Sequence, residues 1–277
     1  MQHLLERSDV NPNLANEDSQ KALLWGIEIK SQEVVQHLLE RTDVDPNLAD
    51  KDSLTPLLLA ARACRRHRNV HLLLGRADVD PNLVDKDGQT PLLLAVGGRR
   101  HERSVQLLLE RADVDPNLAD KGGRTPLLWA VENERLEEAR LLLERDNVDP
   151  NLADKDSRTP LSWAAQNFWG HGLVQLLLER ADVPNSADKD GRTPLSWAAG
   201  EGNQKAIQSL LKQGVVDSSI TDNQGLTPLK WATRWGHHRI AWCLFVYRPH
   251  TIFETTWRPG TSLTAKIPNY IYLYPFK

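Results

Sequence analysis

The chain has 277 residues, of which 40% are hydrophobic and 26% are charged, a balance that is typical of folded proteins and excludes disorder throughout. A formal net charge of -3 at pH 7 excludes a global attraction to nucleic acid or to anionic membranes. Two cysteines, Cys64 and Cys243, lack the spacing of a zinc site or a disulfide framework, and apolar runs stay far below the roughly 20 residues that span a bilayer. We therefore predict an intracellular protein, cytoplasmic or alternatively nuclear, without a membrane segment.

The first residues repeat a later segment. Residues 2–7 read QHLLER and are identical to residues 36–41, so the chain opens inside a repeated unit. We expect residues 1–16 to form a half repeat that holds a second helix and a loop. Repeat stacks normally end in a polar cap, which a half repeat does not provide. We interpret the chain as a fragment of a longer protein; the alternative is a small protein with a frayed start.

The tripeptide Thr-Pro-Leu marks successive copies of one unit. It begins at Thr55, Thr90, Thr125, Thr159, Thr193 and Thr227, with spacings of 35, 35, 34, 34 and 34 residues. A degenerate copy, Lys21-Ala22-Leu23, precedes the first by 34 residues. Self-similarity at such a period indicates a repeat protein. We predict seven repeats over residues 17–247, the first of them degenerate.

Each unit predicts two helices and a projecting loop. Thr can cap the first helix with its hydroxyl, and Pro at the first helical position loses no hydrogen bond. The spacing of Leu127, Ala130 and Val131 gives one such helix an apolar face, while the loop turns at residues 85–88 and 188–191 favour a positive φ at glycine. Because one unit cannot bury its apolar face alone, copies must stack. The fold class predicted is an all-α solenoid of helix-turn-helix units with hairpin-like loops.

This unit resembles the ankyrin repeat, through Thr-Pro-Leu-x-x-Ala, a later Leu-Leu and a loop with Ala-Asp-Val, over residues 17–247. Its TPLSWAA segments, joined by DVDPNLADKD, are similar to arrays of large fungal receptor-like proteins that carry an NTPase module. The chain departs from the family in two places. The His that usually follows Thr-Pro-Leu is replaced, and the Gly after the second helix is mostly absent, with Gly214 as one copy and Gly75 as a further candidate. We expect these departures to change inter-repeat hydrogen bonds and helix ends, not the fold.

The resemblance implies a protein-protein interaction module that binds through its concave face and loop tips. The variable positions lie before Thr-Pro and just after the Ala pair of the first helix. We predict the following partner-binding residues: Gln89, Arg124, Arg158, Arg192, Leu226, Arg62, Glu132, Gln166, Glu201, Arg234 and Trp235. The partner is predicted to be a protein of unknown identity.

The acidic loops do not form a calcium site. Asp78, Asp80 and Asn82 begin like an EF-hand, but the sixth position is Leu83 and the twelfth is Gln89, where the motif needs Gly and a bidentate Glu. Nucleophile-elbow, phosphate-loop, dinucleotide-binding and HExxH motifs are missing from the sequence. We predict no catalytic residue, no metal, no cofactor and no enzymatic activity.

Two columns of side chains recur along the repeats. Trp occupies one repeat position five times, at Trp25, Trp129, Trp163, Trp197 and Trp231. This column is interpreted as packing between successive first helices, or as an open ladder for a peptide; Trp235, Phe168 and Trp169 interrupt the pattern and are further contact candidates. The second column is a predicted basic patch of Arg65, Arg66, His67, Arg99, Arg100 and His101. Its alternatives are solvated turns, an acidic protein partner, or nucleic acid and nuclear import.

The last predicted helix, residues 240–247, reads IAWCLFVY and is apolar on every face, although a capping helix should show water a polar side. Residues 248–277 form a non-repeat tail that is aromatic and basic. We expect this tail to dock partly on the last helix; disorder and partner binding are the alternatives.

Overall fold

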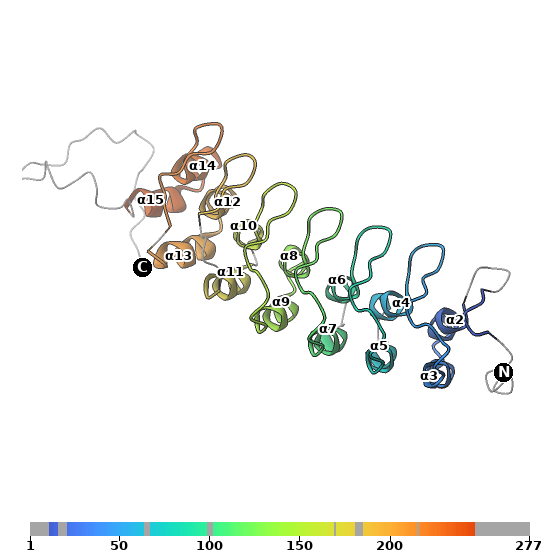
Figure 1. The fold of residues 1–277 in the computed structure, drawn as a ribbon. Coiled ribbons are helices and arrows are strands. Elements are labelled where there is room, and N and C mark those ends of the chain that lie inside the picture. Colours follow the sequence, from blue (N-terminus) through green and yellow to red (C-terminus); the bar gives the residue numbers. More distant parts are fainter. Residues whose placement is uncertain are drawn as a thin grey trace, which may run out of the picture.

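The structure, a computed structural model, describes residues 11–15, 21–63, 67–98, 102–168, 170–180, 185–214 and 216–246. Within this part of the chain, fourteen α-helices form seven pairs that stack side by side (Figure 1). The first helices are α2 (Ala22–Glu28), α4 (Pro56–Arg62), α6 (Pro91–Gly97), α8 (Pro126–Glu132), α10 (Pro160–Gln166), α12 (Pro194–Glu201) and α14 (Pro228–Arg234). The second helices are α3 (Gln32–Glu40), α5 (His67–Leu74), α7 (Glu102–Leu109), α9 (Leu136–Leu143), α11 (His171–Leu178), α13 (Gln204–Lys212) and α15 (His238–Val246). The predicted all-α solenoid is confirmed.

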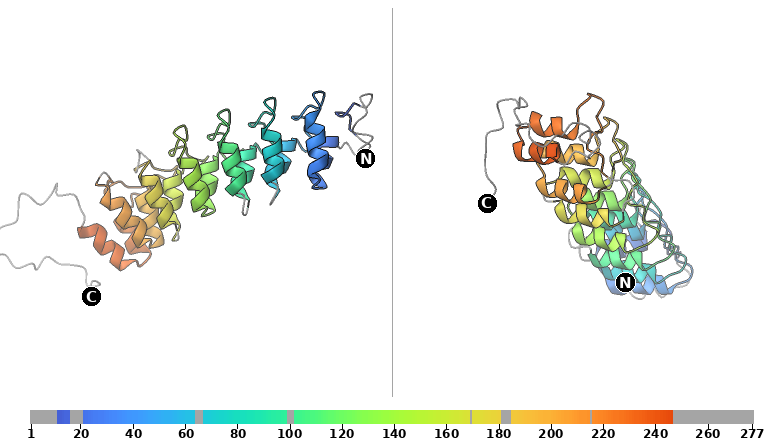
Figure 2. Two further views of the ribbon diagram at one scale, coloured as in Figure 1. Left: turned by 90° about the horizontal axis from the view of Figure 1, so that it is seen from below. Right: turned by 90° about the vertical axis from the view of Figure 1, so that its left-hand side faces the viewer.

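The first helices form one row, the second helices form another, and a loop projects between successive pairs (Figures 1 and 2). We call each such loop a finger. Among the described residues, the main helix contacts join neighbours along the stack, so that α4, for example, packs on α2, α5 and α6. Residues far apart in sequence therefore meet only through the repeat period, as expected for a one-dimensional fold.

Thr-Pro-Leu starts each first helix from α4 onward as the sequence predicts. In α8, the Thr125 hydroxyl accepts from the N–H of Leu128 at 3.3 Å, and Pro126 is the first helical residue. The same cap recurs at α4, α6, α10, α12 and α14. In the degenerate repeat, Lys21 makes no side-chain cap. The apolar face follows, because Leu127, Ala130 and Val131 are each at most 1% exposed.

The fingers are rigid because an aspartate organises each turn. Asp85 accepts through Oδ1 from the N–H groups of Asp87 and Gln89, both at 2.9 Å, and Gly88 adopts the left-handed φ of 77° that the turn predicts. Ser157 takes the position of Gly88 in a later finger with a φ of 59°, a conformation that strains a residue with a Cβ.

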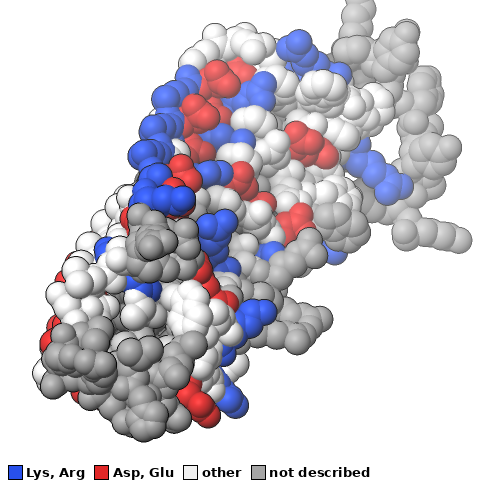
Figure 3. Space-filling view, turned by 90° about the vertical axis from the view of Figure 1, so that its right-hand side faces the viewer, with Lys and Arg blue, Asp and Glu red and all other residues white. Residues whose placement is uncertain are grey.

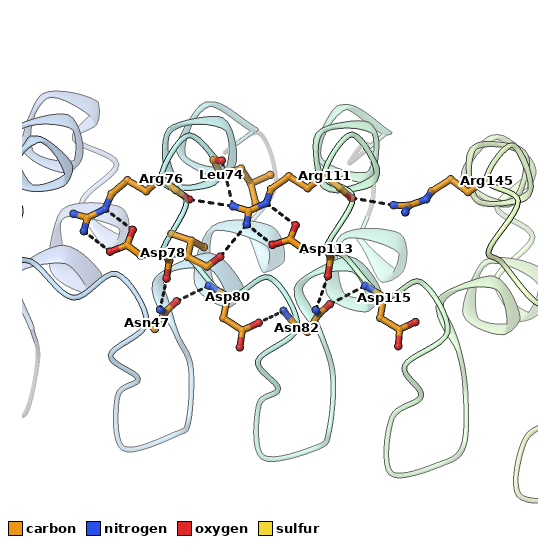
Figure 4. A network of polar contacts seen from close by, with 11 residues as sticks. Asn47, Leu74, Arg76, Asp78, Asp80, Asn82, Arg111, Asp113, Asp115 and Arg145 are labelled. Atoms are coloured by element: carbon orange, nitrogen blue, oxygen red, sulfur yellow. Dashed lines mark hydrogen bonds and ion pairs between the residues drawn. The ribbon is translucent and has the colours of Figure 1, made fainter.

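Arginines close the second helices in place of the family's glycine. Arg111 Nη1 donates to the carbonyls of Leu74 and Arg76, at 3.3 and 3.1 Å, at the end of the preceding second helix (Figure 4). The last carbonyl groups of a helix carry a partial negative charge and have no N–H partner within the helix, so a guanidinium can satisfy them. The members of this arginine ladder are Arg76, Arg111, Arg145 and Arg180. The equivalent position in the next repeat is Gly214, with a φ of 70°, which is the left-handed glycine that usually ends such a helix.

A second ladder of asparagines ties the fingers together. Asn47 Nδ2 donates to the carbonyl of Asp78 at 2.7 Å, and Asn47 Oδ1 accepts from the N–H of Asp80 at 2.9 Å (Figure 4). Asn82 and Asn117 repeat both bonds. Asn13 does the same toward the following finger, so residues 11–15 occupy a finger's place in the ladder.

The last described helix leaves apolar surface open. In α15, Ile240 and Leu244 are buried, but Trp242, Phe245 and Val246 are 42%, 51% and 64% exposed. The predicted tail, residues 248–277, and most of the predicted half repeat, residues 1–16, lie outside the described residues. None of the helices in the described part is long and apolar enough to cross a membrane.

Candidate functional site

We call the surface between the first helices and the fingers the inner face. A tryptophan of each first helix from α8 onward is fixed there to the finger of its own repeat. Trp129 Nε1 donates to Asp120 Oδ2 at 3.1 Å, and Trp197 Nε1 donates to Asp188 Oδ2 at 2.9 Å. The same bond joins Trp163 to Asp154 and Trp231 to Asp222. Each aspartate therefore holds both a finger turn and an indole ring.

Arginine guanidinium groups stack between these indole rings. The Cζ atom of Arg158 lies 3.7 Å from the ring centroid of Trp163 and 4.1 Å from that of Trp197 in the next repeat. The Cζ atom of Arg192 lies 4.6 Å from the Trp197 centroid and 3.9 Å from the Trp231 centroid. In this part of the indole column, Trp163, Trp197 and Trp231 therefore pack through intervening guanidinium groups.

The side chain that faces the arginine guanidinium changes from repeat to repeat at one position, eight residues after the arginine. In repeat four, Arg124 Nη1 lies 3.5 Å from Glu132 Oε2, and Arg124 also pairs with Asp120 at 3.0 Å. In repeat five, Arg158 Nη2 donates to the neutral amide oxygen of Gln166. In repeat six the corresponding residue is Gly200, which offers no side chain.

This loss opens a cleft of about 290 Å³ between α12 and α14. Its walls come from two fingers, from α12 and from the end of α14, and consist of Arg192, Ser196, Trp197, Gly200, Glu201, Gln224, Trp231, Arg234 and Trp235. Trp235 is 61% exposed, and the Cζ atom of Arg234 lies 5.5 Å from the Trp231 centroid. The cleft therefore combines aromatic surface with two guanidinium groups.

The environment shifts the pKa of several of these groups. Burial raises the pKa of Asp222, but hydrogen bonds from the N–H of Leu226 and from the Trp231 indole outweigh it, so the pKa lies below the ordinary value. Asp120 behaves in the same way. Burial lowers the pKa of Arg158, despite the nearby aspartates. Asp120 and Asp222 therefore stay ionised at neutral pH and hold the indole rings of Trp129 and Trp231.

The predicted partner-binding residues separate into two groups. Half-buried residues that belong to the inner-face packing or its edge are Gln89, Arg124, Arg158, Arg192, Leu226, Glu132 and Gln166. Exposed residues are Arg62, Glu201, Arg234 and Trp235. Four of the predicted residues, Arg192, Glu201, Arg234 and Trp235, meet in the cleft. Phe168, a further contact candidate, is 61% exposed, and Trp169 lies outside the described residues.

Most of the predicted basic patch cannot be placed. Arg65, Arg66, Arg99, Arg100 and His101 lie outside the described residues, while His67 starts α5 and is exposed. The patch stays a prediction. Lys and Arg side chains form a row along the edge of the fingers, next to Asp and Glu side chains. This row lies at the left in Figure 3. There, Lys86 Nζ pairs with Asp52 Oδ1 of the preceding finger at 2.7 Å.

Sequence reasoning missed the Trp-to-Asp bonds and Gly200. The signal for the bonds was present, because an aspartate precedes each of these tryptophans by nine residues, as at Asp120 and Trp129. The signal for Gly200 is the register itself, since a comparison with Glu132 and Gln166 exposes the missing side chain.

The family model described as "Ankyrin repeats (3 copies)" matches residues 63–154, 99–186 and 161–251, well over half of the chain. The chain therefore belongs to the ankyrin-repeat family. Among solved structures, the ankyrin repeat domain of Bcl-3, a unique member of the IkappaB protein family, is similar, with a TM-score of 0.70 and 29% sequence identity over 80% of this chain and 100% of that chain. No curated protein matches the chain.

Ankyrin repeats are generally protein-interaction modules, so membership of the family indicates a protein partner. The finer resemblance to fungal NTPase-ankyrin proteins stays a prediction.

Proposed function

We propose that this chain binds a partner protein along its inner face and finger tips and has no catalytic role. The observation that carries the proposal is the cleft between α12 and α14, where Trp235 stands exposed beside Arg234. Trp and Arg are the residues that most often dominate the binding energy of protein interfaces. The remaining predicted residues occupy equivalent register positions in the other repeats.

The surrounding structure is suited to presenting such a surface. The two ladders and the stacked arginines fix the fingers and first helices before any partner arrives, so that little conformational entropy is lost on binding. We propose that the interaction takes place inside the cell, in the cytoplasm or alternatively in the nucleus, because the two cysteines lack the spacing of a disulfide framework.

The test is affinity capture of partners from a cell extract by the complete chain, compared with the same capture by Trp235→Ala. The matched control is Trp242→Ala, which removes the same side chain from the second helix α15, where Trp242 is 42% exposed. We expect Trp235→Ala to lose partners that Trp242→Ala retains, with both variants keeping their helical circular dichroism. Equal capture by the two variants would rule out the cleft as part of the binding surface.

A further inference from the structure

The inner face contains its own template for a ligand. In repeat four, the carboxylate of Glu132 lies against the guanidinium of Arg124, with Nη1 and Oε2 3.5 Å apart. In repeat five, the Gln166 amide oxygen takes that place beside Arg158. Both acceptors come from the residue eight positions after the arginine. In two repeats, therefore, a side-chain oxygen lies beside the guanidinium that stacks on the indole ring.

In repeat six, the arginine remains but the acceptor is gone. Arg192 is held between the rings of Trp197 and Trp231, and its buried Nε has no hydrogen-bond partner, as is also the case for Arg158 Nε. Among the described residues, none accepts a hydrogen bond from its guanidinium. A second guanidinium, that of Arg234, lines the same cleft. Unpaired guanidinium donors next to a cavity favour an incoming acceptor, and a carboxylate is the acceptor that matches their fork geometry.

The cleft also has room for such a group. A Cβ built on Gly200 would lie 3.8 Å from Trp231 Cε3 and 3.9 Å from Trp235 Cδ1, which are ordinary contact distances. A side chain that enters at this point therefore fits between the two rings. The ring faces would cover its methylene groups while the carboxylate reaches the guanidinium groups.

The nearby acids do not satisfy these donors. Asp222 accepts from the N–H groups of Gln224 and Leu226, both at 2.9 Å, and from the Trp231 indole at 2.8 Å, so both of its oxygens are engaged. Asp222 still attracts Arg192 electrostatically. Glu201 lines the cleft and is exposed, so it competes with any incoming acid.

We propose that the cleft binds a glutamate or aspartate side chain of the partner protein, which takes beside Arg192 the place that Glu132 holds beside Arg124. This inference rests on the proposed function and specifies its chemistry: the partner presents an acidic segment to repeats six and seven.

The experiment uses the complete chain labelled with 5-fluorotryptophan, with the signals of Trp197, Trp231 and Trp235 assigned by single Trp→Phe variants. Fluorine NMR follows titration with acetyl-Gly-Ser-Glu-Ser-Gly-amide and with the same peptide carrying Gln. We expect saturable shifts of these signals in the millimolar range with the Glu peptide, and binding weaker by roughly tenfold with the Gln peptide, because charge-assisted bonds are about twice as strong as neutral ones. Inorganic phosphate is titrated in parallel.

Two glycine variants make the test specific. Gly200→Glu supplies the missing carboxylate from within and should abolish the shifts. Gly97→Glu is the matched control, because Gly97 holds the same repeat position in α6, where its Cβ would likewise lie 3.8 Å from a tryptophan ring, and it leaves the cleft untouched. Glu201→Gln should tighten binding of the Glu peptide severalfold, since it removes the competing acid.

Equal binding of the Glu and Gln peptides, or binding that survives Gly200→Glu, would overturn the proposal. Phosphate that produces the same shifts at the same concentration would also overturn it, by showing a simple anion site. If peptide binding fails while Trp235→Ala still loses partners, only the acidic chemistry is wrong and the interaction surface stands. If Trp235→Ala also keeps every partner, the proposed function fails with it.

Discussion

Replacing Arg111 by alanine should destabilise the stack more than the loss of its ion pair alone would. The guanidinium donates to the carbonyls of Leu74, Arg76 and Val79, at 3.3, 3.1 and 3.2 Å. Hydrogen bonds from a charged donor contribute about 1.5 to 3 kcal/mol each when buried, but these carbonyls regain water in the variant. We therefore expect a total loss of about 2 to 3 kcal/mol. The ion pair with Asp113, which is 53% exposed, adds less than about 1 kcal/mol.

The assay is urea unfolding of the complete chain, followed by circular dichroism. Arg103→Ala is the control, because Arg103 is 56% exposed and its ion pair with Glu110 spans 3.6 Å, so its loss should cost under about 0.5 kcal/mol. Arg111→Lys tests geometry, since a lysine cannot bridge several carbonyls as a guanidinium does. If Arg111→Ala and Arg103→Ala unfold at the same urea concentration, the helix-closing role of the ladder is refuted.

Three further changes have defined outcomes. Leu177→Ala removes a fully buried side chain of α11 and should cost about 2 to 5 kcal/mol in urea unfolding, whereas a comparable loss in exposed Gln175→Ala would show that the helix faces are misassigned. Ser157→Gly relieves a φ of 59°, so it should increase the free energy of unfolding by roughly 0.5 to 1 kcal/mol and raise the melting temperature. The control Ser218→Gly, at a position without positive φ, should lower the melting temperature, and a fall in both variants would argue against strain at Ser157. Hydrogen bonds outweigh burial and hold the pKa of Asp120 below its ordinary value. Its contribution to the free energy of unfolding is therefore complete above about pH 4 and is lost as the pH falls through the folded-state pKa. Melting temperatures should thus depend less on acid pH in Asp120→Asn than in the parent, and an identical dependence would contradict this.

The repeat period made the fold predictable. Helix starts at Thr-Pro depend on local chemistry, and the stack follows because each unit has an apolar face that only a neighbour can cover. The helix ends were harder to predict, because the arginines that close them act on the preceding repeat. Arg76 and Arg111 fall at equal spacing, but only the structure shows that their donors reach carbonyls about one repeat earlier.

The candidate site was predictable in position but not in detail. Arg124, Arg158 and Arg192, predicted as partner-binding, lie on the inner face. The sequence does not show that a side chain eight residues later faces the guanidinium of the first two, and that none does so at Arg192. That difference depends on a single missing side chain at Gly200. The repeat pattern shows the residues that recur, whereas the cleft between α12 and α14 depends on Gly200, where the recurring side chain is absent.

The arginine ladder also has a consequence for the order in which the repeats are completed during synthesis. Each arginine follows the helix that it closes by about one repeat, as Arg111 follows Arg76 by 35 residues. A ribosome therefore synthesises every such second helix before the arginine that completes it, so the carbonyls at the end of that helix gain these hydrogen bonds only after part of the next repeat has been made. At the equivalent position of repeat six, the left-handed Gly214 ends α13 from within its own repeat.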